Sequence, residues 1–366
     1  MIKRNAVPVG ESPTSVPALA DLGWDDGVQV LYDASLRRLE PPAPARARGA
    51  RVLHRDRTVC TVGTDSGMHQ VTIAQHLLAS PLEAPTTGDF VVVCDSEVVA
   101  VLERRTAVMR AAFRDLSAQV LAANVDTVLA VSSLANPWRP RRVERLLVIA
   151  WQTGAVPIVV LTKADCCADA GEVYEAAVCV APGCAVHVVS AFTGEGMAGL
   201  SAELAPRTTS VMIGTSGAGK STLANALSDG EAGLATAEIR EDGKGRHTTV
   251  RRELVTLSNG ALMIDTPGLR AIGLWGAEDA LADAFSDVEE LSLGCRFNDC
   301  AHDSEPGCAV KEAIDDGRLD LARLESYRGL QREQRRLAAR TDARLRAERA
   351  AQFKQFAKQQ RSQFYR

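Results

Sequence analysis

A glycine-rich segment with a single lysine could bind the phosphates of a nucleotide. It has the pattern Gly-x-x-x-x-Gly-Lys-Ser, follows an apolar run at 210–213 and precedes helix-forming residues 222–227. Its backbone N–H groups could wrap a β-phosphate at a helix N-terminus, where the helix dipole favours negative charge. Lys220 would neutralise the β- and γ-phosphates, and the Ser221 hydroxyl would ligate Mg²⁺. The predicted phosphate-binding residues are Gly214, Thr215, Ser216, Gly217, Ala218, Gly219, Lys220, Ser221 and Thr222.

Two segments downstream could complete a magnesium and γ-phosphate site. Asp265 ends an apolar run and begins Asp-Thr-Pro-Gly, so its carboxylate could hold Mg²⁺ through water. The N–H group of Gly268 could reach the γ-phosphate. Thr248 or Thr249 could complete the magnesium shell when the γ-phosphate is present, which makes residues 236–249 a candidate switch.

Hydrolysis of a nucleoside triphosphate also needs a group that orients the attacking water. Small GTPases use a Gln directly after the Asp-x-x-Gly motif, whereas this chain has Leu269 at that place. His247 is our candidate for the role because a histidine can accept or donate a proton near neutral pH. The alternative is a polar loop residue without a catalytic role. We therefore expect Lys220 and His247 to be the catalytic residues.

A segment upstream could read a guanine base. Thr162-Lys163-Ala164-Asp165 follows a β-type run at 157–161, and Ser190-Ala191 ends another. A buried Asp165 would accept the N1 and N2 hydrogens of guanine, a donor pair that adenine lacks, while the stem of Lys163 packs over the base. Ser190-Ala191 would add a backbone N–H to the guanine O6. Thr162 stands where Asn is usual and can donate only through its hydroxyl.

These segments occur in a rotated order. In the common small GTPases the phosphate loop opens the domain and the base-reading motif lies near its end. Here the base-reading segments come first and the phosphate loop follows them. The order therefore predicts a circularly permuted GTPase.

Four metal-type ligands crowd into residues 295–308. The spacing Cys295-x₄-Cys300-x-His302-x₅-Cys308 provides three thiolates and one imidazole, a closed tetrahedral set that leaves no position for water. The set predicts one structural Zn²⁺ per chain, and the alternative is four residues without a metal. We interpret the other cysteines as small apolar residues or surface thiols: Cys60, Cys94, Cys166, Cys167, Cys179 and Cys184.

The elements that must position these groups follow three sequence patterns: short β-type runs, alternating strands and helices, and C-terminal helical segments. Short β-type runs separated by Gly, Asp and Pro turns predict a small barrel, and the OB fold is the commonest such barrel that binds nucleic acid. From residue 124 strands and helices alternate, as in a parallel sheet with crossover helices. The β-type runs are 50–54, 58–62, 70–73, 90–93 and 98–102, the first crossover helix is 140–153, and residues 278–293 and 309–360 are expected to be helical.

The net charge of −4 conceals an asymmetry. Residues 321–366 hold thirteen Lys or Arg against four acids, a net +9, and the rest of the chain therefore carries −13. A basic tail suits a phosphate-rich partner, although it could also be a solvated helix face. Residues 1–47 mix Pro, Ala and charge, which predicts a mobile extension with a short ordered patch around Leu22-Gly23-Trp24 and no assigned fold.

A length of 366 residues suggests two or three domains, and a hydrophobic content of 46% is that of an ordinary soluble globular protein, which we expect in the cytoplasm. The sequence has no run of eighteen apolar residues, and its N-terminus leads into a Pro-rich polar stretch. We therefore expect no membrane association. Nine cysteines in a reducing compartment argue against a disulfide framework. We also expect a monomer.

Together these motifs resemble the bacterial small-ribosomal-subunit-dependent GTPase A family, over about residues 48–330. The resemblance implies a multidomain α/β protein with an extension at 1–47, an OB-fold β-barrel at 48–104, a circularly permuted P-loop GTPase domain at 105–277 and a helical zinc-binding domain at 278–366. The segments that carry it are Ala123-Asn124-Val125-Asp126, Thr162 to Asp165, the phosphate loop, Gly245 to Thr249, Asp265 to Leu269, Cys295 to His302 and Ser304 to Cys308.

The resemblance also implies a function. Members of the family bind the 30S subunit late in its assembly, and the subunit stimulates their hydrolysis of GTP to GDP and phosphate. The barrel and the basic tail would be surfaces for 16S rRNA. Two alternatives remain: a permuted GTPase that acts on the large subunit, and a nucleotide-dependent RNA-binding module with little turnover.

Overall fold

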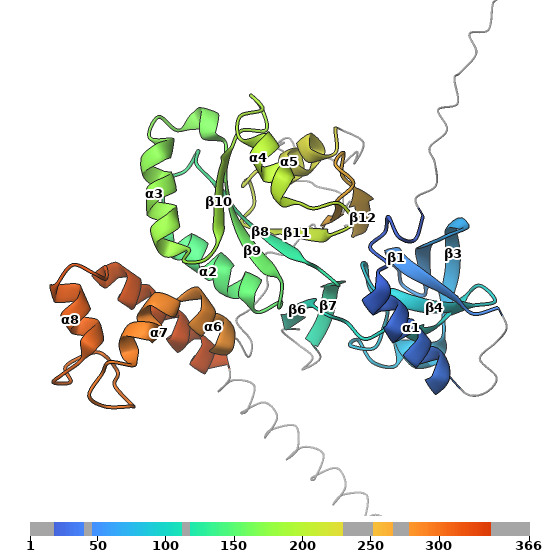
Figure 1. The fold of residues 1–366 in the computed structure, drawn as a ribbon, viewed down its shortest axis with the longest axis horizontal. Helices are drawn as coiled ribbons and strands as arrows, with labels where there is room; N and C mark the ends of the chain where they lie inside the picture. The colour runs from blue at the N-terminus through green and yellow to red at the C-terminus, as the bar shows by residue number, and fades with distance from the viewer. Residues whose placement is uncertain (1–17, 40–45, 112–117, 230–251, 266–277, 338–366) are drawn as a thin grey trace, which may run out of the picture.

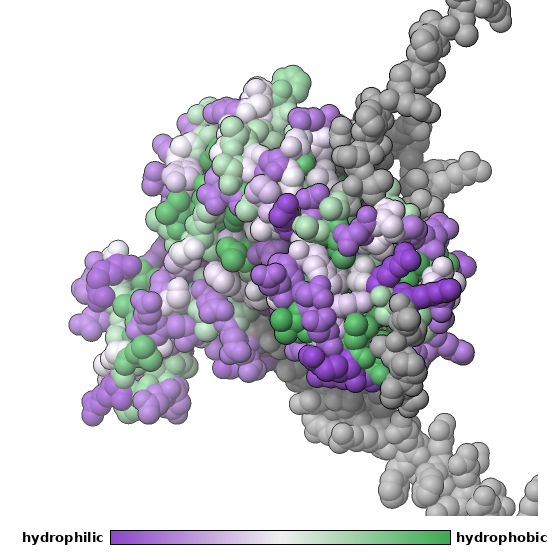
Figure 2. Space-filling model, turned by 45° about the vertical axis from the view of Figure 1, so that its right-hand side comes forward, coloured by the Kyte–Doolittle hydropathy of each residue, from purple (hydrophilic) through white to green (hydrophobic). Residues whose placement is uncertain are grey.

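The computed structural model describes residues 18–39, 46–111, 118–229, 252–265 and 278–337. The candidate switch with His247, Thr248 and Thr249 lies outside these ranges, as do Gly268 and the tail beyond residue 337. No helix within the described ranges is both long enough and apolar enough to cross a membrane. On the face drawn in Figure 2, hydrophobic residues are scattered among hydrophilic ones.

The first part of the chain forms a closed five-stranded barrel (Figure 1). Its strands run in the order β1-β2-β3-β5-β4, and β4 returns to pair with β1. The interior is filled by alternate apolar residues such as Val52, Val62 and Val91. The OB-fold prediction is confirmed, and each of the five β-type runs is a strand. The elements are β1 (Arg48–Asp56), β2 (Val59–Thr64), β3 (Gly67–Ile73), the 3₁₀ turn η1 (Gln75–Leu78), β4 (Phe90–Cys94) and β5 (Glu97–Val101).

Residues 18–39 are folded against this barrel, which corrects the prediction of an extension without a fold. Helix α1 (Asp26–Arg38) begins at Asp25, whose side chain accepts the Val28 N–H. Trp24 covers Gly49 so closely that a Cβ there would lie 2.3 Å from the indole. Leu22 covers Gly63 in the same way. The extension is ordered by these tertiary contacts, which local composition does not reveal.

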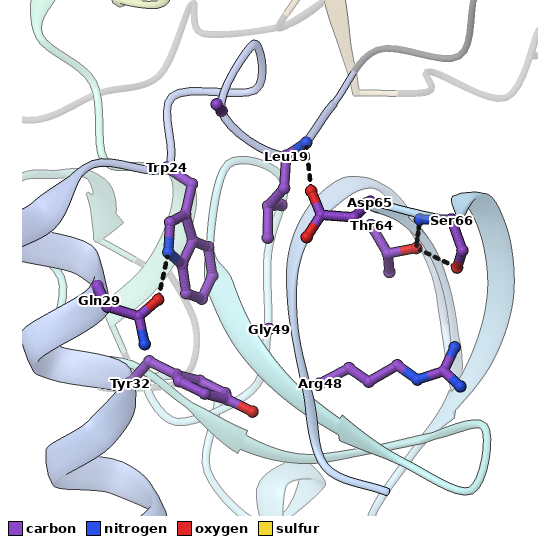
Figure 3. Close-up of a pocket in the computed structure, with 10 residues that line it drawn as sticks. Leu19, Trp24, Gln29, Tyr32, Arg48, Gly49, Thr64, Asp65 and Ser66 are labelled. Atoms are coloured by element: carbon purple, nitrogen blue, oxygen red, sulfur yellow. Dashed lines mark hydrogen bonds between the residues drawn. The ribbon is translucent and has the colours of Figure 1, made fainter.

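A pocket of about 560 Å³ remains between this segment and the barrel (Figure 3). Trp24 and Tyr32 border it on the helix side, and the Trp24 indole donates to Gln29. Thr64, Asp65 and Ser66, at the turn between β2 and β3, border it on the barrel side. The backbone N–H of Leu19 donates to Asp65, which ties the N-terminal segment to the barrel at the edge of the pocket.

The central part of the chain is a mostly parallel sheet with helices on both faces. The strand order is β10-β9-β8-β11-β13-β12, and only β12 runs antiparallel to its neighbour in this half. The elements are β8 (Thr127–Ser133), α2 (Pro140–Trp151), β9 (Val156–Thr162), η2 (Ala164–Cys166), α3 (Ala170–Val180), β10 (Ala185–Val189), α4 (Met197–Glu203), β11 (Thr209–Ile213), α5 (Lys220–Leu227), β12 (Glu253–Thr256) and β13 (Leu262–Asp265).

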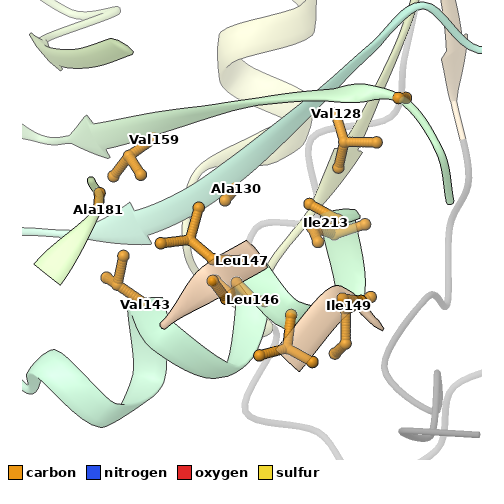
Figure 4. Packing of buried hydrophobic residues seen from close by; sticks show 14 of the residues in the cluster. Val128, Ala130, Val143, Leu146, Leu147, Ile149, Val159, Ala181 and Ile213 are labelled. Atoms are coloured by element: carbon orange, nitrogen blue, oxygen red, sulfur yellow. The ribbon is translucent and has the colours of Figure 1, made fainter. Parts of the chain in front are cut away.

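Alternate residues of each strand point to opposite faces of this sheet. Val128 and Ala130 pack against α2, whose Val143 and Leu147 face them in Figure 4. The residue between the two strand positions, Leu129, packs with the side chains of α4 and α5 on the other face. The sheet is therefore buried on both sides, as its continuous apolar runs require.

The barrel and this sheet are joined in two ways. A hairpin of β6 (Ala107–Ala111) and β7 (Ala118–Ala123) connects them along the chain. In addition β1 pairs with β12, so that one eleven-stranded sheet runs through both parts. Neither the hairpin of β6 and β7 nor the pairing of β1 with β12 follows from the sequence pattern.

Arg51 fills the junction with a buried guanidinium that is 1% exposed. It donates to the carbonyl oxygens of Leu22, Gly88 and Asn124 and to Oγ1 of Thr209, the last at 2.7 Å. These acceptors belong to the N-terminal segment, the barrel, the end of β7 and β11. One side chain thus holds four parts of the chain together.

Short helices at the other end of the sheet form the third unit (Figure 1). They are α6 (Glu278–Ala284), α7 (Ser286–Ser292), α8 (Ala309–Asp315) and the helical residues 321–337. The expectation of one helix from 309 is wrong, because Gly317 takes a positive φ of 73° after α8. Arg323, which we counted in the basic tail, is buried and paired with Glu144 and Asp287.

We predict that Arg51→Met lowers the free energy of unfolding by about 3–5 kcal/mol, because buried acceptors lose their donor. Arg51→Lys should recover only part of this loss, since one ammonium cannot reach all four acceptors. Urea unfolding measures the effect. Arg48→Met, at the exposed start of the same strand, is the matched control and should change the free energy by less than about 0.5 kcal/mol. Equal effects of the two methionine variants would contradict the role of Arg51.

Candidate functional site

Four predicted segments meet at one edge of the parallel sheet. Strands β9, β10, β11 and β13 all end there, because the carboxyl ends of parallel strands share an edge. The Ser190 hydroxyl donates to Asp165, and the Thr162 hydroxyl donates to the carbonyl of Ala218. The structure thus brings the base-reading and phosphate-binding segments together although 49 residues separate Asp165 from Gly214 in the sequence.

The glycines of the phosphate loop have backbone conformations that other residues rarely adopt. Gly214, Gly217 and Gly219 have φ values of +153°, +76° and +85°. A Cβ on Gly214 would lie 2.3 Å from the Val131 carbonyl oxygen, so the loop must pass β8 without a side chain. The loop then enters α5 through Gly219, and the N-terminus of a helix is a place where backbone N–H groups and the helix dipole favour an anion.

Lys220 at the start of α5 folds back over this loop. Its Nζ donates to the carbonyl oxygens of Gly214 at 2.8 Å and Thr215 at 2.9 Å. The ammonium therefore lies above the loop where phosphates would be enclosed. Thr215, Ser216 and Thr222 are exposed, whereas Ser221 is half-buried beside it.

Asp165 is exposed, which corrects the expectation of a buried carboxylate. Its Oδ1 accepts the Ser190 hydroxyl at 2.5 Å, and its Oδ2 accepts the Cys166 thiol at 3.3 Å. These two hydrogen bonds, that from Ser190 first, hold the pKa of Asp165 below its usual range. An anionic carboxylate can accept two N–H groups of a base edge. Sequence reasoning missed the thiol of Cys166, although its position next to Asp165 was the available signal.

Thr162 connects the base-reading strand with the phosphate loop. Its side chain is buried, and its Oγ1 donates to the Ala218 carbonyl at 2.6 Å. The hydroxyl thus makes a bond to the phosphate loop at a position where Asn is usual. Lys163 follows with a left-handed φ of +61°, and its Cε comes within 3.8 Å of the place that a Cβ on Gly219 would occupy. The lysine stem thus lies beside the loop. Ala191, the other predicted residue here, is half-buried directly after Ser190.

Asp265 is half-buried at the end of β13. Burial raises the pKa of Asp265, the positive charge of Lys220 lowers it and the charge of Glu253 raises it. A cation near Asp265 would stabilise the ionised form of this carboxylate. The assignments of His247, Thr248, Thr249 and Gly268 stay predictions, since these residues lie outside the described ranges.

The Cys/His set forms a compact cluster in the C-terminal unit. Cys295, Cys300, His302 and Cys308 place their ligand atoms within 4.8 Å of one another. His302 Nδ1 lies 3.6 Å from the sulfur of Cys295 and 3.5 Å from that of Cys308, and the two sulfurs are 3.9 Å apart. Tetrahedral bonds of about 2.3 Å to sulfur and 2.1 Å to nitrogen give edges of roughly 3.8 and 3.6 Å. The cluster can therefore hold a metal ion.

Comparison with known proteins gives consistent matches. The family model "RsgA GTPase" matches residues 101–275. A "Small ribosomal subunit biogenesis GTPase RsgA" of Streptomyces coelicolor is 45% identical over 349 residues, which cover 92% of this chain and 92% of that protein. A protein called "Small ribosomal subunit biogenesis GTPase RsgA 1", of Listeria innocua, is 44% identical over 69% of this chain and 73% of its own length.

Two solved structures share the fold. The crystal structure of YjeQ from Thermotoga maritima has a TM-score of 0.59 at 24% identity, covering 78% of this chain and 97% of that one. YloQ, described as a circularly permuted GTPase, has a TM-score of 0.57 at 23% identity, covering 80% and 96%. The permuted strand order predicted from the motifs is therefore a known architecture.

We predict that Thr162→Val lowers the free energy of unfolding by about 1–2 kcal/mol, because the buried Ala218 carbonyl loses its donor. Thr162→Ser keeps the hydroxyl and should retain most of the stability. Denaturant titration measures both variants. Thr256→Val, on the exposed side of β12, is the control for the change of side chain. A loss of stability as large for Thr256→Val as for Thr162→Val would show that the Ala218 bond is not the cause.

Proposed function

The chain belongs to the RsgA GTPase family, as its 45% identity over 92% of its length shows, and we propose that this GTPase acts on the small ribosomal subunit late in its maturation. Binding of a guanine nucleotide is supported by one observation: Asp165, Thr162 and the phosphate loop lie together at one edge of the sheet. The names of the curated relatives support the ribosomal part.

Guanine specificity rests on Asp165. Its carboxylate is kept anionic by two donors, and guanine presents two N–H groups on the edge that such a carboxylate recognises. Adenine has no matching pair of donors. Ser190 fixes the carboxylate, Ala191 supplies a backbone N–H for the guanine O6, and Lys163 covers the base. Thr162 keeps the strand end against the phosphate loop.

The phosphates would occupy the loop from Gly214 to Thr222. The backbone N–H groups bind the β-phosphate, and Lys220 exchanges its carbonyl partners for phosphate oxygens. Ser221 and Asp265 would hold a Mg²⁺ ion, which neutralises charge on the triphosphate. Among residues outside the described ranges, Gly268 would contact the γ-phosphate, Thr248 or Thr249 the metal, and His247 the attacking water.

The Cys/His cluster is proposed to hold one structural Zn²⁺. Three thiolates and an imidazole are ligands that zinc prefers, and the spacings among Cys295, His302 and Cys308 match edges of a tetrahedron. Residues 295–308 are otherwise irregular and contribute few buried side chains, so a metal would supply much of their folding free energy.

The proposed partner is the 30S subunit with its 16S rRNA, approached by a monomer in the cytoplasm. The barrel is of the type that binds oligonucleotides, and the tail from residue 321 is basic even without the buried Arg323. A permuted GTPase of the large subunit would share the motif order.

Hydrolysis measured without ribosomes, with 30S and with 50S subunits tests the partner. We expect the rate of GTP turnover to rise when 30S subunits are added and to stay unchanged when 50S subunits are added. Stimulation by 50S, or by neither subunit, would contradict the proposal.

The same assay tests the base-reading role through Asp165→Asn. The amide donates where the carboxylate accepted, so this variant should lose GTP turnover by about tenfold or more and should gain turnover of xanthosine triphosphate. Asp169→Asn, in the loop that follows, is the matched control. If Asp165→Asn keeps the preference for GTP over xanthosine triphosphate, Asp165 does not recognise the base.

Elemental analysis tests the metal. Purified protein should contain one zinc per chain, and Cys308→Ser should lose the metal and lower the melting temperature, because three ligands bind zinc more weakly than four. Cys179→Ser, an exposed cysteine on α3, should keep both zinc and stability. Full stability of Cys308→Ser without zinc would contradict a structural metal.

A further inference from the structure

Three residues in register connect the barrel to the magnesium side of the site. His54 in β1 pairs with Glu253 in β12, and Glu253 pairs with Asp265 in β13. Neighbouring strands lie about 4.8 Å apart, so Asp265 is only two strands from the barrel wall. The barrel is thus joined directly to the strand that positions the proposed magnesium ligand.

Two side chains of the barrel also hold Arg252, the residue directly before β12. Nδ1 of His54 lies 2.7 Å from the carbonyl oxygen of Arg252, and the Thr87 hydroxyl donates to the same oxygen at 3.3 Å. A carbonyl oxygen only accepts, so Nδ1 of His54 carries the proton. Two donors from different segments of the barrel therefore fix one backbone group at the start of β12.

A displacement of β12 would change the position of Asp265. Glu253 in β12 lies opposite Asp265 in β13 in the register of the two strands, so the backbone position of Asp265 depends on that of β12. The ladder between β12 and β13 leaves little freedom for one strand to move alone.

Positive charge gathers where the barrel meets β12. Burial lowers the pKa of Arg252, and the charges of Arg110 and Arg55 lower it further. Arg55 is anchored to the barrel by its bond to the Pro85 carbonyl. Arg55 follows His54 and Arg252 precedes Glu253, so the antiparallel pairing of β1 with β12 sets these two arginines opposite each other. Guanidinium groups gathered in this way favour an anion, and RNA offers phosphates.

We propose that His54 and Thr87 are positioning residues that couple binding of ribosomal RNA phosphate at this junction to Asp265, and so to the rate of GTP hydrolysis. A phosphate bound by Arg55 and Arg252 displaces the barrel wall and the start of β12 together, because His54 and Thr87 hold the Arg252 carbonyl. The register then carries the movement to Asp265. This inference rests on the proposed stimulation by the 30S subunit.

The test compares the ratio of 30S-stimulated to basal kcat across a set of variants. His54→Ala removes the donor. His54→Asn places an amide N–H close to the position of Nδ1, whereas His54→Gln places it close to Nε2. Thr87→Val removes the second donor. The matched control is His69→Ala, because His69 is also a barrel histidine but bonds to Ser66 within the barrel.

We expect the ratio to fall about fivefold in His54→Ala, the effect of one neutral hydrogen bond, and less in Thr87→Val, whose bond is longer. His54→Asn should restore the ratio, and His54→Gln should not. The KM for GTP and the affinity for 30S should stay near those of the unchanged protein. His69→Ala should keep the full ratio.

Three outcomes are distinguishable. If the unchanged protein is not stimulated by 30S, the proposed function itself fails. If the unchanged protein is stimulated and His54→Ala keeps the same ratio, the coupling is overturned while the function stands. If 30S affinity falls in His54→Ala along with the ratio, His54 contributes to binding and is not a positioning residue, which also overturns the inference.

Discussion

The buried guanidinium of Arg51 is the interaction on which the arrangement of the protein depends. It lies between the N-terminal segment, the barrel, the end of β7 and β11, and it donates to an acceptor in each. Burial lowers the pKa of Arg51 to about 10, so the group stays charged at neutral pH. A charge without water needs all of its donors paired, and only this relative placement of the four parts supplies the acceptors. Because β11 leads into the phosphate loop, the barrel and the nucleotide site share one fixed frame.

A second buried arginine has the same role at the opposite end of the sheet. Arg323 pairs with Glu144 of α2 and Asp287 of α7 and donates to the Ala284 carbonyl, while its guanidinium lies 4.0 Å from the centre of the Phe285 ring. Glu144 also accepts the Ser326 hydroxyl. The C-terminal helices are thereby fixed to the face of the sheet that α2 covers. Both outer units are held by directional polar bonds, which specify orientation more strictly than apolar contact does.

The placement of the candidate site residues could be predicted from the sequence to a large extent, because local patterns determine it. Apolar runs that end in motif residues place those residues at the carboxyl edge of a parallel sheet, and the structure confirms this meeting for Asp165, Ser190 and the phosphate loop. The parts that escaped prediction depend on contacts between distant segments. Helix α1 is ordered by Trp24 over Gly49, and β1 pairs with β12 across about 200 residues. The exposure of Asp165 and the burial of Arg323 likewise follow from packing, which periodicity does not encode.

The central claim is that the barrel is coupled to the nucleotide site through β12 and β13. Hydrogen–deuterium exchange of the backbone amides in β12 and β13, with and without 30S subunits, tests it most directly. The account predicts that binding of the subunit changes exchange at residues 253–256 and 262–265, together with β1 of the barrel. A change confined to the barrel, with unaltered exchange in β12 and β13, would contradict it.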